Sequence, residues 1–175
     1  ASVTGNKATN GTLNGGGVYV NGSGTFAMNN SASVSDNTAN QGGGVYVYSG
    51  TFNMNGNASI THNTAKNEKT SNDTNGGGVY VSNNGKFTMN GDASISCNEA
   101  KGNGGGVYMD GGKFTMTGGE ISGNEAEGNG GGVYMDGITF AVSGTAVIKD
   151  NKKDTANNNV YLPGNKYITI GGTLD

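Results

Sequence analysis

The chain has 175 residues, of which 35 are glycine and 32% are hydrophobic, with one proline, one cysteine and no tryptophan. Its formal net charge is −3 and every basic residue is a lysine, so we expect no nucleic-acid partner, because a basic patch and the arginine fork that reads guanine are both missing. A single cysteine permits no internal disulfide. No stretch is long and apolar enough to predict membrane insertion, and the length suits one domain, residues 1–175.

The sequence Gly-Gly-Gly-Val-Tyr occurs five times, and a sixth copy reads Asn-Asn-Asn-Val-Tyr. The copies return every 26 to 34 residues. A period of this size is typical of a solenoid, in which each repeat buries its apolar face only by stacking on its neighbours. The valines of the six copies are Val18, Val45, Val79, Val107, Val133 and Val160.

Three short segments in each repeat alternate apolar and polar residues, which is the pattern of a strand with one buried face. In chain order they are Val-Tyr-Val, Phe-x-Met, and a lone Val or Ile between small polar residues, as at 45–47, 52–54 and Ile60. Three strands per repeat of about 27 residues predict an all-β fold, a parallel β-helix of about six coils. We expect the third segment to recur last at Leu174, and the longest insertion, residues 66–75, to lie at a corner.

An asparagine follows the lone Val or Ile of each repeat by three positions. If these side chains point inward, each amide bonds to the asparagine of the coil above and of the coil below, which satisfies the polar groups that burial would otherwise leave unpaired. We therefore predict a structural ladder rather than a binding site. Its members are Asn6, Asn37, Asn63, Asn98, Asn124 and Asn151.

The tyrosine of each Val-Tyr pair faces outward if the valines on either side face inward. The sequence thus predicts a stack of rings that forms an exposed stripe. Two interpretations stay open: cross-strand aromatic stacking that stabilises the sheet, or a platform for sugar rings or a partner protein. The candidate ligand-binding residues are Tyr19, Tyr46, Tyr80, Tyr108 and Tyr134.

Other candidate sites are weaker. Asp110 and Asp136 each follow Val-Tyr-Met, so they share a register and form a candidate calcium pair. His62 and Cys97 share another register, but neighbouring acids are spread over several coils, too far apart for a catalytic triad or a zinc site. In four copies a Ser or Thr stands on each side of the lone Val or Ile, as Ser33 and Ser35 do around Val34. Such rows of hydroxyl groups resemble those of ice-binding proteins.

The combination of Ile95-Ser96-Cys97-Asn98 with Gly104-Gly105-Gly106-Val107 resembles the β-helix repeats of large bacterial and archaeal surface proteins, including polymorphic membrane protein repeats. The resemblance extends over nearly the whole chain. It implies a right-handed parallel β-helix and an adhesin-like extracellular role. Pectate lyases, epimerases and phage tailspikes have similar architecture, but fold alone does not carry function.

From these patterns we expect a non-catalytic extracellular stalk or adhesin module, attached to the cell surface or secreted, and not an enzyme. The expected partners are a host or cell-surface glycan or protein and flanking β-helix coils of a longer surface protein, because neither end carries a recognisable cap. No cofactor is expected apart from calcium at the aspartate pair. The alternatives are a carbohydrate-binding β-helix, an ice-binding protein and a polysaccharide lyase-like enzyme, the last disfavoured by the absence of arginine.

Overall fold

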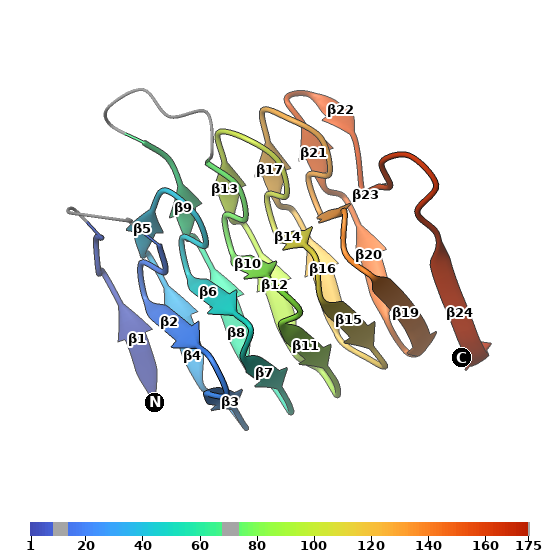
Figure 1. Cartoon of the computed structure of the whole chain (residues 1–175), viewed down its shortest axis with the longest axis horizontal. Coiled ribbons are helices and arrows are strands. Elements are labelled where there is room, and N and C mark those ends of the chain that lie inside the picture. Colours follow the sequence, from blue (N-terminus) through green and yellow to red (C-terminus); the bar gives the residue numbers. More distant parts are fainter. Residues whose placement is uncertain (9–13, 68–73, 175) are drawn as a thin grey trace.

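A computed structural model describes residues 1–8, 14–67 and 74–174 of the chain. Across these ranges the secondary structure consists of short strands and turns, without a helix. Strands from successive coils lie side by side along the long axis of the molecule, as Figure 1 shows, and form four six-stranded sheets. The predicted parallel β-solenoid of about six coils is confirmed.

The serine sheet contains β1 (Ser2–Thr4), β4 (Ser33–Ser35), β8 (Ser59–Thr61), β12 (Ser94–Ser96), β16 (Glu120–Ser122) and β20 (Val147–Lys149). The tyrosine sheet contains β2 (Val18–Asn21), β6 (Val45–Tyr48), β10 (Val79–Ser82), β14 (Val107–Asp110), β18 (Val133–Met135) and β23 (Val160–Tyr161). The phenylalanine sheet contains β3 (Thr25–Met28), β7 (Thr51–Met54), β11 (Lys86–Met89), β15 (Lys113–Met116), β19 (Thr139–Gly144) and β24 (Ile168–Leu174).

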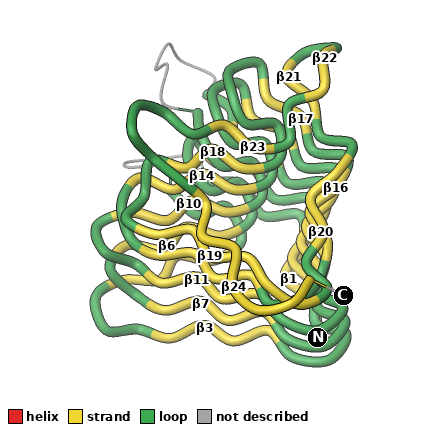
Figure 2. The backbone as a smooth tube through the Cα atoms, turned by 90° about the vertical axis from the view of Figure 1, so that its right-hand side faces the viewer, coloured by secondary structure: helices red, strands yellow, loops and turns green. Residues whose placement is uncertain are grey.

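A fourth sheet, which we call the flange sheet, was not predicted. It contains β5 (Thr38–Ala39), β9 (Thr64–Ala65), β13 (Glu99–Ala100), β17 (Glu125–Ala126), β21 (Lys152–Lys153) and β22 (Ala156–Asn157). Two-residue strands are too short to show a period, so sequence alternation does not reveal them. Its last pair, β21 with β22, is antiparallel, whereas the other strand pairs of the described coils are parallel. The flange projects from the body at the upper right of Figure 2.

The register keeps like residues on like. Val79 pairs with Val45 and Val107, and Phe87 pairs with Phe52 and Phe114. The serine, tyrosine and phenylalanine sheets enclose the core. Figure 2 shows these sheets from the end of the solenoid. The second and third coils each contribute an inward valine pair, one Phe-x-Met and one Ile, and in later coils Met109 and Met135 replace the second valine and Val142 replaces the methionine. In the inner coils these side chains are fully buried. The predicted core columns are therefore confirmed.

The expected positions of Leu174 and of the long insertion have different outcomes. Leu174 does not continue the third column, because it pairs with Gly144 in the phenylalanine sheet after a register shift that follows Val142. The long insertion does fall at the corner between the flange and the tyrosine sheet, after β9, but its residues 68–73 lie outside the described part of the chain.

The Gly-Gly-Gly turn has a distinct requirement at each position. The first glycine, such as Gly104 with φ +67°, adopts a left-handed conformation that side chains disfavour. A Cβ on the second, Gly105, would lie 2.3 Å from the carbonyl oxygen of Glu125, and a Cβ on the third, Gly106, would lie 3.0 Å from the amide nitrogen of Asn124. Both neighbours belong to the following coil. The second and third glycines therefore form a seat on which the next coil rests.

Candidate binding surfaces

The six predicted asparagines form the inner ladder. Asn63 donates from its backbone N and from Nδ2 to Oδ1 of Asn98, at 2.9 and 3.0 Å, and Nδ2 also donates to the carbonyl oxygen of Val34 at 3.0 Å. The same bonds link Asn98 to Asn124 and Asn124 to Asn151. The four inner members from Asn37 to Asn124 are at most 1% exposed, and no buried side-chain polar atom among the described residues lacks a partner. These amides are fully used inside the protein.

Two further polar ladders escaped the sequence analysis. Asn90 donates through Nδ2 to Oδ1 of Asn55 and Asn55 to Asn29, each at 3.0 Å, in the turn that follows Phe-x-Met. Directly before the Gly-Gly-Gly turn, Oδ1 of Asn75 accepts from the backbone N of Asn103 at 2.7 Å, and Oδ1 of Asn103 accepts from the backbone N of Asn129 in the same way. The available signal was the asparagine that follows the methionine in three of the four Phe-x-Met copies and precedes four of the five Gly-Gly-Gly copies.

The tyrosines form one continuous stack. Neighbouring ring centroids from Tyr19 to Tyr161 lie 4.9 to 5.3 Å apart, with interplanar angles of 7 to 29°. The expected exposed stripe is wrong in its middle, because Tyr46 is only 6% exposed and Tyr80 only 4%. One reason is that the glycine turn packs against the Cβ atoms of these tyrosines. A Cβ on Gly76 would lie 2.9 Å from the Tyr80 Cβ.

The hydroxyls of the buried tyrosines also have partners within the protein. The Tyr46 hydroxyl shares a hydrogen bond with the Ser82 hydroxyl at 3.1 Å, and the Tyr80 hydroxyl donates to Oδ2 of Asp110 at 3.1 Å. Burial, followed by the negative charge of Asp110, raises the pKa of the Tyr80 hydroxyl, and burial raises that of Tyr46. Interior rings thus have both faces covered by neighbours, whereas Tyr19, 48% exposed, ends the stack.

The two candidate calcium ligands have different partners. Asp110 accepts the Tyr80 hydroxyl, while Oδ1 of Asp136 lies 3.3 Å from the Lys166 ammonium. In the described ranges no group of three or more His, Cys, Asp or Glu side chains is arranged to hold a metal ion. Calcium binding at this pair stays a prediction.

The hydroxyl ranks occupy the outer face of the serine sheet. Ser33, Ser59 and Ser94 lie in register on successive coils, but the rank ends at Glu120, whose carboxylate lies 3.0 Å from the Lys149 ammonium. Beside this face, His62 and Cys97 occupy equivalent exposed corners with φ of 56° and 55°. The predicted register is therefore correct, and charge interrupts the face in its last two coils.

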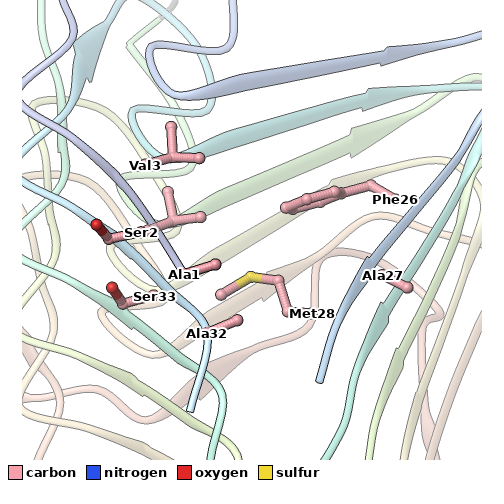
Figure 3. Close-up of a pocket in the computed structure, with 9 residues that line it drawn as sticks. Ala1, Ser2, Val3, Phe26, Ala27, Met28, Ala32 and Ser33 are labelled. Carbon is pink, nitrogen blue, oxygen red and sulfur yellow. The ribbon is translucent and has the colours of Figure 1, made fainter. Parts of the chain in front are cut away.

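An apolar hollow of about 130 Å³ opens at the N-terminal end of the core. Figure 3 shows Val3, Phe26 and Met28 around it, between the strands β1 and β3. Val3 and Phe26 are partly exposed there, although the same positions are buried in inner coils. The remaining lining residues are Ala1, Ser2, Ala27, Ala32, Ser33 and Val34.

No protein-family model matches the chain, and neither a curated protein nor a solved structure matches it. In the part of the chain that the structure describes, no helix is long and apolar enough to cross a membrane.

Proposed function

We propose that the chain is a non-catalytic, extracellular β-solenoid stalk of a cell-surface or secreted protein. The observation that carries the proposal is the unbroken inner ladder, in which every member from Asn6 to Asn151 bonds to the next. Such ladders tie each coil to both neighbours and so resist local opening. A stalk needs coils that stay bonded to one another along its length, and it needs no deep binding pocket.

The use of the polar and aromatic side chains supports the same proposal. The buried asparagines and the hydroxyls of Tyr46 and Tyr80 bond to groups of adjoining coils, so they stabilise the solenoid and are not free to act on a substrate. The asparagine-rich and serine-rich composition suits an exported protein. The resemblance to bacterial and archaeal surface-protein repeats agrees with this role.

A second candidate function, adhesion to a cell-surface glycan or protein, is favoured by one exposed aromatic pair. Tyr19 and Tyr48 are 48% and 41% exposed and lie on neighbouring strands of the tyrosine sheet. Sugar rings stack on aromatic faces, and the interior rings present edges only. A glycan would therefore contact the Tyr19 end of the sheet rather than the whole stripe.

Glycan-array and cell-adhesion assays on the folded chain separate the two candidates. If the chain is only a stalk, the wild-type protein is expected to bind glycans and cells no more strongly than the Tyr19→Ser/Tyr48→Ser variant does. Binding by the wild type that this variant loses, with unchanged circular dichroism, would replace the plain stalk by the adhesin. Binding that the variant retains would show that another surface is responsible.

A further inference from the structure

The sixth coil, which contains Asn151 and Val160, differs from the others at the seat, the two positions that the second and third glycines occupy elsewhere. From the ladder asparagine to the Val-Tyr pair it has the same length as the fifth coil, since Asn151 precedes Val160 by as many residues as Asn124 precedes Val133. Where the fifth coil carries glycines at 130–132, the sixth carries asparagines at 157–159. The side chains therefore change while the spacing does not.

The seat accepts the next coil only because it lacks Cβ atoms. A Cβ on Gly131 would lie 2.0 Å from the carbonyl oxygen of Lys152, and a Cβ on Gly132 would lie 2.7 Å from Nδ2 of Asn151. Equivalent contacts occur at Gly77 and at Gly78. Asn158 and Asn159 occupy these same two positions in the sixth coil. The Asn158 side chain turns back to the fifth coil, where its Oδ1 accepts from the backbone N of Gly130, and the Asn159 side chain lies where a seventh coil would place its ladder asparagine.

Asn159 also takes over the hydrogen bonds that a following coil supplies elsewhere. Both the backbone N and Nδ2 of Asn151 donate to Oδ1 of Asn159, at 3.0 and 3.1 Å, as Asn124 donates to Asn151. The carbonyl oxygen of Asn151 accepts from the backbone N of Asn158 at 2.8 Å, whereas that of Asn124 accepts from Lys152 of the next coil. Because the chain turns back here and bonds to its own coil, β22 pairs with β21 in the antiparallel direction.

We propose that residues 157–159 are a stop signal that closes the C-terminal end of the solenoid against another coil, in particular against the N-terminal coil of a second copy. That coil is the matching surface, because β1, β2 and β3 end their sheets there, as β20, β23 and β24 do at the other end, and because it presents the apolar hollow at Phe26 and Met28. At this end the proposal differs from the expectation that further coils cover both ends, which stays untested. Terminal coils with polar caps keep solenoids from associating end to end.

The direct test restores the seat with Asn157→Gly, Asn158→Gly and Asn159→Gly together. Sedimentation velocity and electron microscopy are expected to show head-to-tail rods that lengthen with protein concentration, and adding Phe26→Lys is expected to reverse this. Asn83→Gly/Asn84→Gly, in an exposed turn with φ of 50° and 66°, is the matched control. A folded triple variant that stays monomeric, or wild-type protein that forms the same rods, overturns the proposal.

The reciprocal test installs the signal inside the array, with Gly105→Asn/Gly106→Asn. These side chains are expected to unseat the fifth and sixth coils, so that amides of residues 120–161 lose hydrogen-exchange protection while β6 and β7 keep theirs. Gly171→Asn is the control, since a Cβ there meets nothing within 4 Å and the backbone does not have a positive φ. Full protection of 120–161 in the double variant would show that asparagine does not block the seat.

Discussion

Phe87 and Phe114 stack with ring centroids 4.6 Å apart and planes 7° from parallel. They come from neighbouring coils, and their strands β11 and β15 pair residue for residue. The distance between neighbouring strands of a parallel sheet is close to the distance between the centroids of two stacked aromatic rings. A phenylalanine repeated in every coil can therefore keep the strands paired and fill the core at the same time. In the tyrosine stack and in the inner asparagine ladder, the distance between strands likewise brings identical side chains of neighbouring coils into contact.

Replacing Phe87 by alanine removes a ring that stacks on Phe52 and on Phe114. Because the site is fully enclosed, we expect a loss of about 3–5 kcal/mol in the free energy of unfolding, measured by urea denaturation. Lys86→Ala, exposed on the same strand, is the control and is expected to change little. A small effect of Phe87→Ala would mean that the phenylalanine column is not core.

Replacing Asn98 by alanine removes the oxygen that accepts from the backbone N and Nδ2 of Asn63. The buried groups left unpaired are expected to lower the free energy of unfolding by about 1–3 kcal/mol. Asn21→Ala, at an exposed position of β2, is expected to be near neutral. Equal losses in the two variants would contradict a structural role for the ladder.

The period of the sequence was sufficient to predict the strands, the coil number and the inner ladder, because each depends on residues that recur in register. It did not predict the flange sheet, whose strands have two residues each, nor the burial of Tyr46 and Tyr80. Alternation gives the side of a strand on which a residue lies, but not what covers that side. Here the glycine turn and the neighbouring rings cover it, and both are tertiary features.

The end cap was missed for a related reason. The change from Gly-Gly-Gly to Asn-Asn-Asn at 157–159 reads in the sequence as a degenerate repeat. Its meaning depends on the clearance between a glycine of one coil and the ladder asparagine of the next, as between Gly132 and Asn151. Only the stacked structure supplies that distance.

Alkaline pH is expected to destabilise the protein through Tyr80. Burial and the charge of Asp110 raise its pKa above the ordinary value of 10.0, so the folded state holds this proton more tightly than the unfolded state does. The stabilisation is complete below pH 10 and is lost as the pH rises above it, at up to about 1.4 kcal/mol per pH unit. Urea unfolding between pH 8 and 11.5 measures this slope, and Tyr80→Phe is expected to reduce it. Identical slopes would contradict the assignment.

The tyrosine stack is expected to stabilise the solenoid most in its middle. The Tyr80 ring is buried between Tyr46 and Tyr108, so Tyr80→Ser is expected to cost about 3–5 kcal/mol in the free energy of unfolding. Tyr19→Ser, at the exposed end with one stacking neighbour, is expected to cost about 1 kcal/mol. Equal effects at the two positions would show that ring burial does not control stability.

This difference decides how adhesion is to be tested. Changing Tyr46, Tyr80 and Tyr108 together removes three stacked rings and is expected to abolish cooperative unfolding, which circular dichroism during heating detects. Loss of adhesion in that variant would then follow from loss of the fold. The exposed pair Tyr19 and Tyr48 separates the two effects, because its removal leaves the buried rings in place. A triple variant that unfolds cooperatively near the wild-type temperature and still adheres would remove the stack from both the stability and the binding of this protein.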